Sequence, residues 1–86
     1  MAAPRVEPFP RIVRNPRILD GEPAIQGTRI PVRSVVILYH LYKSIDRIVQ
    51  AFPHLDRGLV EEALAFYRAN REEIDQYIRE NESDGN

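Results

Sequence analysis

The sequence predicts a mainly α fold with a small N-terminal β-element: a helix-turn-helix-like (winged-helix-like) body followed by a C-terminal helix. Short apolar runs separated by turn residues come first, and apolar residues then recur at helical spacing. Ser44 and Asp56 stand where helix N-caps are expected. We therefore divide the chain into a flexible or extended arm (1–10), a β-element with the helix-turn-helix-like body (11–69), and a C-terminal partner-binding helix with a frayed tail (70–86).

The size of the chain favours association with a partner. An 86-residue chain buries only about 60% of its unfolded surface, and this chain has no cysteine for a disulfide. We expect a homodimer or a complex. Residues 1–10 lack the apolar core of a signal peptide, and no apolar run approaches the length of a membrane span. These features predict a cytoplasmic protein without a membrane partner.

A turn-rich stretch, GEPAIQGTRIPVRSVV, joins the β-element to the helices. Gln26 and Gly27 separate two short apolar-containing runs (23–25 and 28–30), which predicts a tight hairpin in which Gly27 takes a positive φ. Pro31 lacks a backbone donor and ends any strand there. Ser34 is then a candidate N-cap.

Before this stretch, the β-branched pair in Arg11–Arg14 predicts a short strand that ends at the Asn-Pro turn at 15–16. Ile18 and Leu19 are expected to pack under the hairpin, and Asp20 with Gly21 to form the next turn. The result is a layer of two or three short strands, which is barely stable without further packing.

The run VVILYHLY (35–42) is apolar on nearly every face, so propensity alone fits a strand as well as a helix. Its flanking serines favour a helix. The resulting stripe would hold Val35, Leu38, Tyr39 and Tyr42, with further apolar residues around it. We therefore expect this helix to be buried on two sides.

Two further helices are predicted more clearly. Apolar residues follow Ser44 at i, i+3, i+4 and i+7 until Pro53 ends the segment. Asp56 is the expected cap of a third helix, whose stripe contains Val60, Ala63, Leu64 and Tyr67.

The segment after Ala69 leaves two possibilities open. Asn70 and Glu73 have the spacing of a capping box, but a continuous helix fits equally well. Ile74, Tyr77 and Ile78 form a narrow stripe that would contact either a partner or the domain's own core. Residues 82–86 are expected to fray.

Enzymatic chemistry has little support in this sequence. It contains no cysteine, and its two histidines, His40 and His54, do not form a ligand pair. Adjacent glutamates point about 100° apart on a helix and do not make a two-carboxylate site. We predict a non-enzymatic protein without a catalytic residue, metal or cofactor.

Charge is distributed unevenly along the chain. Residues 1–33 carry six arginines against three acidic residues, a net charge of +3, whereas residues 34–86 have a net charge of −4. If DNA is bound, a basic patch on the β-layer suits it better than the third helix, which carries Glu61 and Glu62. The candidate nucleic-acid-binding residues are Arg11, Arg14, Arg17, Arg29 and Arg33. The alternative for Arg29 and Arg33 is that they brace the hairpin.

The stretch RIVRNPRILDGEPAIQGTRIPV, followed by a short helix, Ser44, Pro53 and another helix, resembles domain-of-unknown-function family 433. This resemblance implies a VapB-type antitoxin that pairs with a PIN-like ribonuclease toxin, with operator DNA as a second candidate partner. We assign toxin binding to the C-terminal helix, whose candidate residues are Arg71, Ile74, Tyr77, Ile78 and Arg79. Both arginines would instead pair with neighbouring carboxylates if this helix is simply solvated. A stand-alone DNA-binding regulator and a self-associating module are the alternatives.

Overall fold

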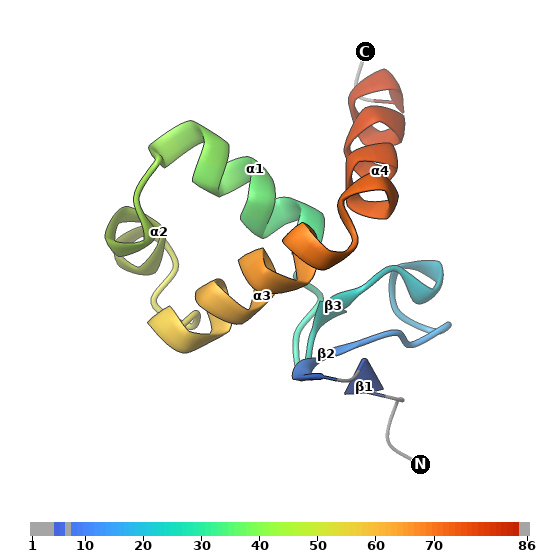
Figure 1. Ribbon diagram of the computed structural model, residues 1–86, viewed down its shortest axis with the longest axis horizontal. Helices are drawn as coiled ribbons and strands as arrows, with labels where there is room; N and C mark the ends of the chain where they lie inside the picture. Colours follow the sequence, from blue (N-terminus) through green and yellow to red (C-terminus); the bar gives the residue numbers. More distant parts are fainter. Residues whose placement is uncertain (1–4, 7, 85–86) are drawn as a thin grey trace.

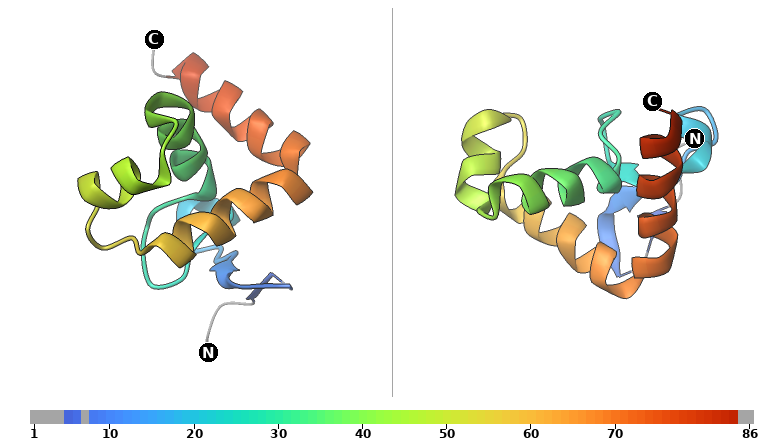
Figure 2. Two further views of the ribbon diagram at one scale, coloured as in Figure 1. Left: turned by 60° about the vertical axis from the view of Figure 1, so that its left-hand side comes forward. Right: turned by 90° about the horizontal axis from the view of Figure 1, so that it is seen from above.

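The computed structural model describes residues 5–6 and 8–84, which form a mainly helical domain with a short N-terminal sheet (Figure 1). Helix α1 lies across α3, and both views of Figure 2 show the corner at which α3 meets α4. The described elements are β1 (Arg5–Val6), β2 (Phe9–Val13), the 3-10 turn η1 (Leu19–Gly21), β3 (Ala24–Ile25), α1 (Val32–Tyr42), α2 (Ile45–Ala51), α3 (Arg57–Ala69) and α4 (Arg71–Asp84).

The sheet is antiparallel, with the strand order β1-β2-β3 and with Ile12 opposite Ile25. It begins earlier in the chain than predicted, because part of the expected arm forms β1 and the start of β2. The ring of Phe9 packs edge-on against Phe66, with 5.3 Å between the ring centroids, which anchors this part of β2. Residues 1–4 and 7 of the expected arm lie outside the described residues.

The predicted turn at Gly27 is confirmed, with φ of +78°. The Thr28 hydroxyl donates to the Ile25 carbonyl and accepts from the Ile30 amide, both at 2.9 Å, so one side chain closes the turn. Residues 28–30 do not form the expected strand. A single bridge pairs Ala24 with Pro31 instead, because the proline ends the ladder.

The second predicted turn is also present. Leu19, Asp20 and Gly21 all have positive φ, between 54° and 87°. Left-handed backbone is costly for a leucine, so the surrounding contacts hold this turn in place.

Helix α1 begins at Val32, so the prediction of Ser34 as its N-cap was wrong. Pro31 occupies the cap position with extended backbone, and the Val32 amide donates to the Pro23 carbonyl at 2.9 Å. This tertiary hydrogen bond satisfies one of the amides that a capping side chain would otherwise satisfy. Ser34 therefore lies inside the first turn.

The prediction that α1 is buried on two sides was wrong for the isolated chain. Val32, Val35 and Val36 are buried on one side. On the outer side Ile37 is 41% exposed and Leu41 is 70% exposed. The described chain thus leaves an apolar face of α1 open.

The predictions for α2 and α3 are confirmed down to their caps. Ser44 accepts from the Arg47 amide, and Asp56 accepts from the Leu59 amide at 2.8 Å. Each cap satisfies a backbone donor that a helix start leaves free.

The chain turns sharply at Asn70, which separates α3 from α4. A continuous helix, one of the two possibilities, is therefore not observed, and neither is the capping box. The side-chain amide of Asn70 donates to the Phe66 carbonyl, and Glu73 pairs with Arg14. The turn brings α4 against the body, so Ile74 joins the core with no exposed surface. The largest fully buried side chains of this core are Phe66, Ile12, Ile25, Ile48, Leu55 and Ile74.

Candidate functional site

Three of the five candidate nucleic-acid-binding arginines are neutralised within the fold. The Arg11 amide and Nε donate to Glu62 at 2.7 and 3.0 Å, and the Arg14 guanidinium donates to Glu73. The two contacts join β2, and the residue that follows it, to helices more than fifty residues away. Arg14 also lies over the Phe66 ring, 5.7 Å from its centroid.

Arg33 completes this group through a buried carboxylate. Its Nε lies 2.7 Å from Oε2 of Glu22, which is only 7% exposed, although the contact lacks the alignment of a hydrogen bond. Burial raises the pKa of Glu22, while the guanidinium of Arg33 opposes this change. The alternative bracing role of Arg33 is thus the observed one.

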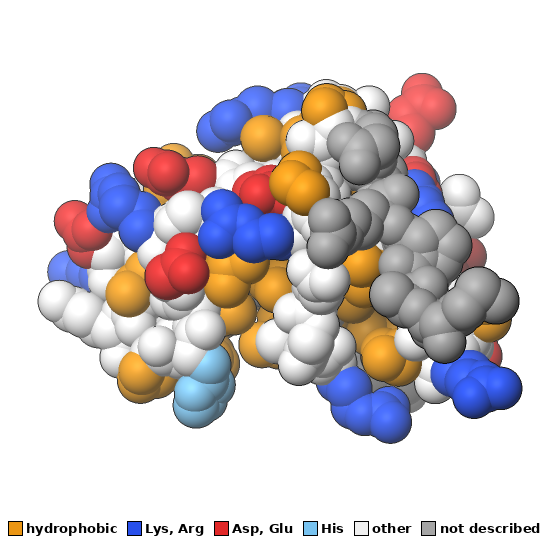
Figure 3. Space-filling view, turned by 90° about the horizontal axis from the view of Figure 1, so that it is seen from below, with side chains coloured by type: hydrophobic (Ala, Val, Ile, Leu, Met, Phe, Trp, Pro, Cys, Tyr) orange, Lys and Arg blue, Asp and Glu red, His pale blue; other side chains and the backbone are white. Residues whose placement is uncertain are grey.

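Opposite charges lie side by side on the surface as well. Arg57, at the start of α3, contacts Asp46 and lies 3.5 Å from Glu61. On the left of the face shown in Figure 3, acidic and basic side chains adjoin one another. Arg17 and Arg29 remain exposed, and they contact no carboxylate within ion-pair distance among the described residues. Carboxylates thus offset the charge of three of the five candidate arginines, and Arg17 and Arg29 are the two that remain without such a partner among the described residues.

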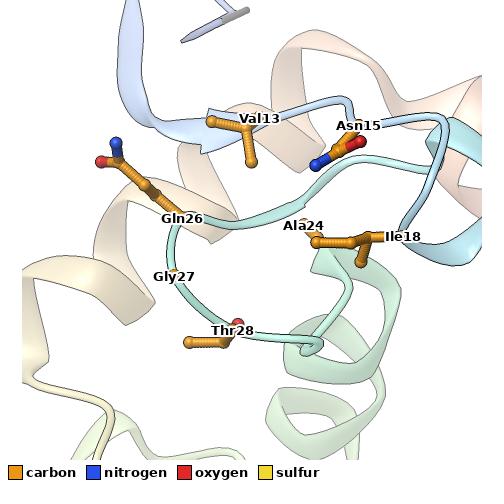
Figure 4. Close-up of a pocket in the computed structure, with 7 residues that line it drawn as sticks. All are labelled: Val13, Asn15, Ile18, Ala24, Gln26, Gly27 and Thr28. Carbon is orange, nitrogen blue, oxygen red and sulfur yellow. The ribbon is translucent and has the colours of Figure 1, made fainter. Parts of the chain in front are cut away.

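A small hollow lies under the hairpin, where Val13 and Asn15 extend toward the loop around Gly27 and Gln26 points away (Figure 4). Its volume is about 170 Å³. The Thr28 hydroxyl is already used by the turn. We assign this hollow to the packing of the turn.

A second hollow lies between α1 and the corner of α3 and α4, and we call it the cationic hollow. It measures about 160 Å³ and combines aromatic with basic side chains above an apolar floor. Its rim is formed by Tyr39, His40, Tyr67, Arg68 and Arg71.

The rim of the cationic hollow is ordered by two contacts. The Arg71 guanidinium lies 5.4 Å from the centroid of the Tyr67 ring, and the Tyr67 hydroxyl donates to Asp75 at 2.8 Å. This hydrogen bond raises the pKa of Tyr67. Arg68 is exposed, and no carboxylate of the described chain lies within ion-pair distance of it. Two guanidinium groups thus face solvent beside two tyrosines.

A third depression, which we call the apolar groove, follows the outer side of α1. Its volume is about 390 Å³, and its walls are almost entirely apolar. Its two polar lining residues are Arg29 and Ser34, and its apolar lining comes from Ile30, Pro31, Ile37, Leu38, Phe52 and Leu55.

The candidate toxin-binding residues of α4 are divided between core and surface. Ile74 is buried, and Tyr77 and Ile78 are half-buried against the same core. Arg71 and Arg79 are exposed, but only Arg71 belongs to the cationic hollow. Sequence reasoning missed Arg68 and Tyr67 as site residues, because they belong to α3 whereas Arg71 begins α4, and only the turn at Asn70 brings them to one hollow.

No three His, Cys, Asp or Glu side chains come together as a possible metal site in residues 5–6 and 8–84. Over the same residues, no helix is long and apolar enough to cross a membrane.

Comparison with known proteins gives the family. The model of the family described as "Protein of unknown function (DUF433)" matches residues 12–67, well over half of the chain. The chain belongs to the DUF433 family.

A solved DUF433 structure supports the fold. The chain is similar to a DUF433 member protein from Anabaena variabilis, whose crystal structure superposes with a TM-score of 0.74 at 28% identity. The match covers 80% of this chain and 68% of that one. The chain is also 34% identical over 59 residues to the uncharacterized protein y4eO of Sinorhizobium fredii (strain NBRC 101917 / NGR234). That match covers 69% of this chain, which spans only 27% of the relative's length.

The DUF433 match contains the whole apolar groove and ends within the cationic hollow. Arg68 and Arg71 lie just beyond the matched residues, together with all of α4.

Proposed function

We propose that this DUF433 protein is an antitoxin that acts by binding, not by catalysis, and that neutralises a PIN-like ribonuclease through the cationic hollow. The family resemblance implies the class of partner. The observation that carries the contact site is the pair of exposed guanidinium groups, Arg68 and Arg71, beside Tyr39 and Tyr67. Arginine and tyrosine are enriched among the residues that dominate protein interfaces.

The chemistry of the hollow suits an acidic partner. PIN-like nucleases, which the resemblance implies, hold their catalytic metal with a cluster of carboxylates. A guanidinium cannot lose its proton at neutral pH and pairs with carboxylates through a fixed fork of donors. Arg71 is held over Tyr67, so part of its conformational freedom is lost before binding. Insertion of Arg68 or Arg71 would displace the metal or block access to it.

This proposal moves the toxin contact from the apolar stripe of α4 to the α1–α3–α4 corner. The burial of Ile74 in the core leaves little of the stripe for a partner in this conformation. Arg71 is retained from the predicted set, and Tyr77 and Ile78 take a supporting role because they pack against the core. Arg79 remains a peripheral candidate on the exposed side of α4.

A stand-alone DNA-binding regulator has less support. In our proposal α2 and α3 form a helix-turn-helix-like scaffold that holds the hollow, not a reader of the major groove. Glu61 is exposed on α3, and Arg57 already contacts acidic neighbours. DNA binding is driven by counterions that are released when basic side chains neutralise phosphates. Carboxylates on α3 would repel the phosphates and weaken this binding.

Co-expression from the native operon tests the proposal. We expect the neighbouring nuclease to co-purify with the wild-type protein, and the R68E/R71E variant to lose this capture and relieve no growth inhibition. The matched control is R17E/R29E, which reverses two exposed arginines outside the hollow. Equal capture by both double variants, or loss of capture only in R17E/R29E, would overturn the proposed site.

Retention on a heparin column separates the two functions. A DNA-binding regulator would lose salt-resistant retention in the R17E/R29E variant and would have no nuclease partner. An antitoxin of the proposed kind keeps nuclease capture in that variant. Operator binding by the wild-type protein without capture of any nuclease would favour the regulator.

A further inference from the structure

Helix α1 carries the large hydrophobic side chains that the described chain exposes, namely Ile37, Tyr39 and Leu41. Tyr39 borders the cationic hollow, whereas Ile37 lines the apolar groove. One helix therefore presents two different surfaces.

The outer face combines a projection with a depression. Leu41 is 70% exposed, and it follows Ile37 by four residues, so the two side chains share one face of the helix. Ser34, about two turns earlier on α1, lines the groove. Ser34 and Leu41 are seven positions apart, a rise of about 10.5 Å along the helix.

This arrangement is complementary to itself. In a two-fold dimer, each residue pair is made twice, with the two copies exchanging roles. If two α1 helices cross antiparallel between Ile37 and Leu38, Leu41 of each copy lies over Ser34 of the other. The serine is small and lines the groove, so it leaves room for the leucine.

The charges fit the same arrangement. An antiparallel crossing brings Arg29, which lines the groove, toward the C-terminal turn of α1 in the second copy. That turn ends at Tyr42 and is capped by Lys43, whose amide donates to the Tyr39 carbonyl at 2.7 Å. The carbonyl groups of the last three helical residues follow at this end of the helix and favour a cation. Arg33, the other guanidinium near the start of α1, is already neutralised by Glu22.

We propose that two copies of this protein associate through the outer face of α1, with Leu41 of each copy seated in the apolar groove of the other. A specific interface at the lower size limit takes about 600 Å² from each copy. That is roughly a tenth of the 5730 Å² of accessible surface of the described chain. The second copy then supplies the second-side burial that the composition of α1 calls for. The interface lies on the other side of α1 from the cationic hollow.

Sedimentation of the full chain tests association. The wild-type protein should sediment as a dimer at micromolar concentration, and L41D should raise the dissociation constant at least tenfold. The matched control is Y39D, which places the same charge on the same helix but outside the groove. A monomeric wild type, or equal weakening by L41D and Y39D with both folds intact by circular dichroism, would overturn the proposal.

Cross-linking tests the arrangement, since the chain has no cysteine of its own. S34C/L41C should form a disulfide-linked dimer on oxidation, and S34C or L41C alone should form much less. Within one chain these positions are too far apart for a disulfide, which needs Cα atoms less than about 7 Å apart. Equal cross-linking by a single variant would overturn the antiparallel register.

Nuclease capture is a separate readout. L41D should still capture the toxin, so a negative result in the dimer experiments leaves the proposed function unaffected. Likewise, if R68E/R71E keeps nuclease capture, the proposed site is wrong but the proposed dimer is unaffected. Loss of capture by L41D at concentrations where it is monomeric and folded would place the nuclease in the groove and overturn the second copy as its occupant.

Discussion

Arg14 and Glu73 join the end of β2 to the first turn of α4 through a bidentate contact, with Nη2 of Arg14 2.9 Å from Oε1 of Glu73. The two residues are 59 positions apart in the sequence. Paired donors in a fork match a carboxylate in both distance and direction, which makes this the strongest type of side-chain ion pair. It holds α4 against the sheet on the same side as Phe66, which Arg14 covers.

The contact predicts a pH dependence of stability. The hydrogen bonds from Arg14 lower the pKa of Glu73 below its ordinary value of 4.5. A lowered folded-state pKa contributes stability above the unfolded-state pKa, and this stability is lost as the pH falls through the folded-state value. E73Q should therefore lower the free energy of unfolding by about 0.5–1 kcal/mol at pH 7 and by much less near pH 3. Urea denaturation at both pH values measures this, and equal losses at the two would contradict it.

The pKa values of Glu22 and Glu73 should be shifted in opposite directions, although each carboxylate faces an arginine. Burial raises the pKa of Glu22, whereas Arg14 lowers that of Glu73. The contribution of Glu22 to stability is therefore present below pH 4.5 and is lost as the pH rises through its raised folded-state pKa. Side-chain carboxyl NMR should give a midpoint above 4.5 for Glu22 and below 4.5 for Glu73. The reverse order would show that Arg33 outweighs burial.

Ile74 should be a core residue and not merely a contact for a partner. It has no exposed surface, so I74A should lower the free energy of unfolding by about 2–5 kcal/mol. I78A, at a half-buried position on the same helix, is the control and should cost clearly less. Chemical denaturation of the isolated protein measures both. Near-wild-type stability of I74A would return this side chain to the partner-binding surface.

Local chemistry explains which helices could be predicted. Ser44 and Asp56 bond to amides three residues away, so the signal for the start of α2 and α3 lies within the sequence window. The start of α1 depends on a hydrogen bond from Val32 to Pro23 and could not be predicted in that way. Ser34 looked like the cap because no local feature reveals that contact.

The turn at Gly27 allows a clean test of backbone strain. Its φ is +78°, and a Cβ atom built there meets no atom within 4 Å. G27A should therefore cost about 1 kcal/mol from conformation alone, which for a domain of this size lowers Tm by about 4–8 °C. G27N is the matched control and should cost less, because asparagine tolerates left-handed backbone. Calorimetry giving a wild-type Tm for G27A would contradict this.

The candidate sites were harder to predict because they depend on contacts between distant segments. Arg11 pairs with Glu62 and Arg14 with Glu73, and each pair joins residues more than fifty positions apart, which no local spacing predicts. Five arginines near one end of the sequence suggested a basic patch, but the fold brings acidic partners to three of them. The cationic hollow needs the turn at Asn70, which the sequence left open.

A double-mutant cycle between the protein and its nuclease tests the central proposal most directly. Binding would be measured by calorimetry for wild type and R71A, each against the wild-type nuclease and a variant with one catalytic carboxylate changed to the amide. We predict a coupling free energy of about 1.5 kcal/mol or more, as found for close charge pairs across interfaces. The same cycle with R79A should give a smaller coupling. Additive effects of R71A and the nuclease substitution, with binding otherwise intact, would contradict insertion of Arg71 into the acidic site.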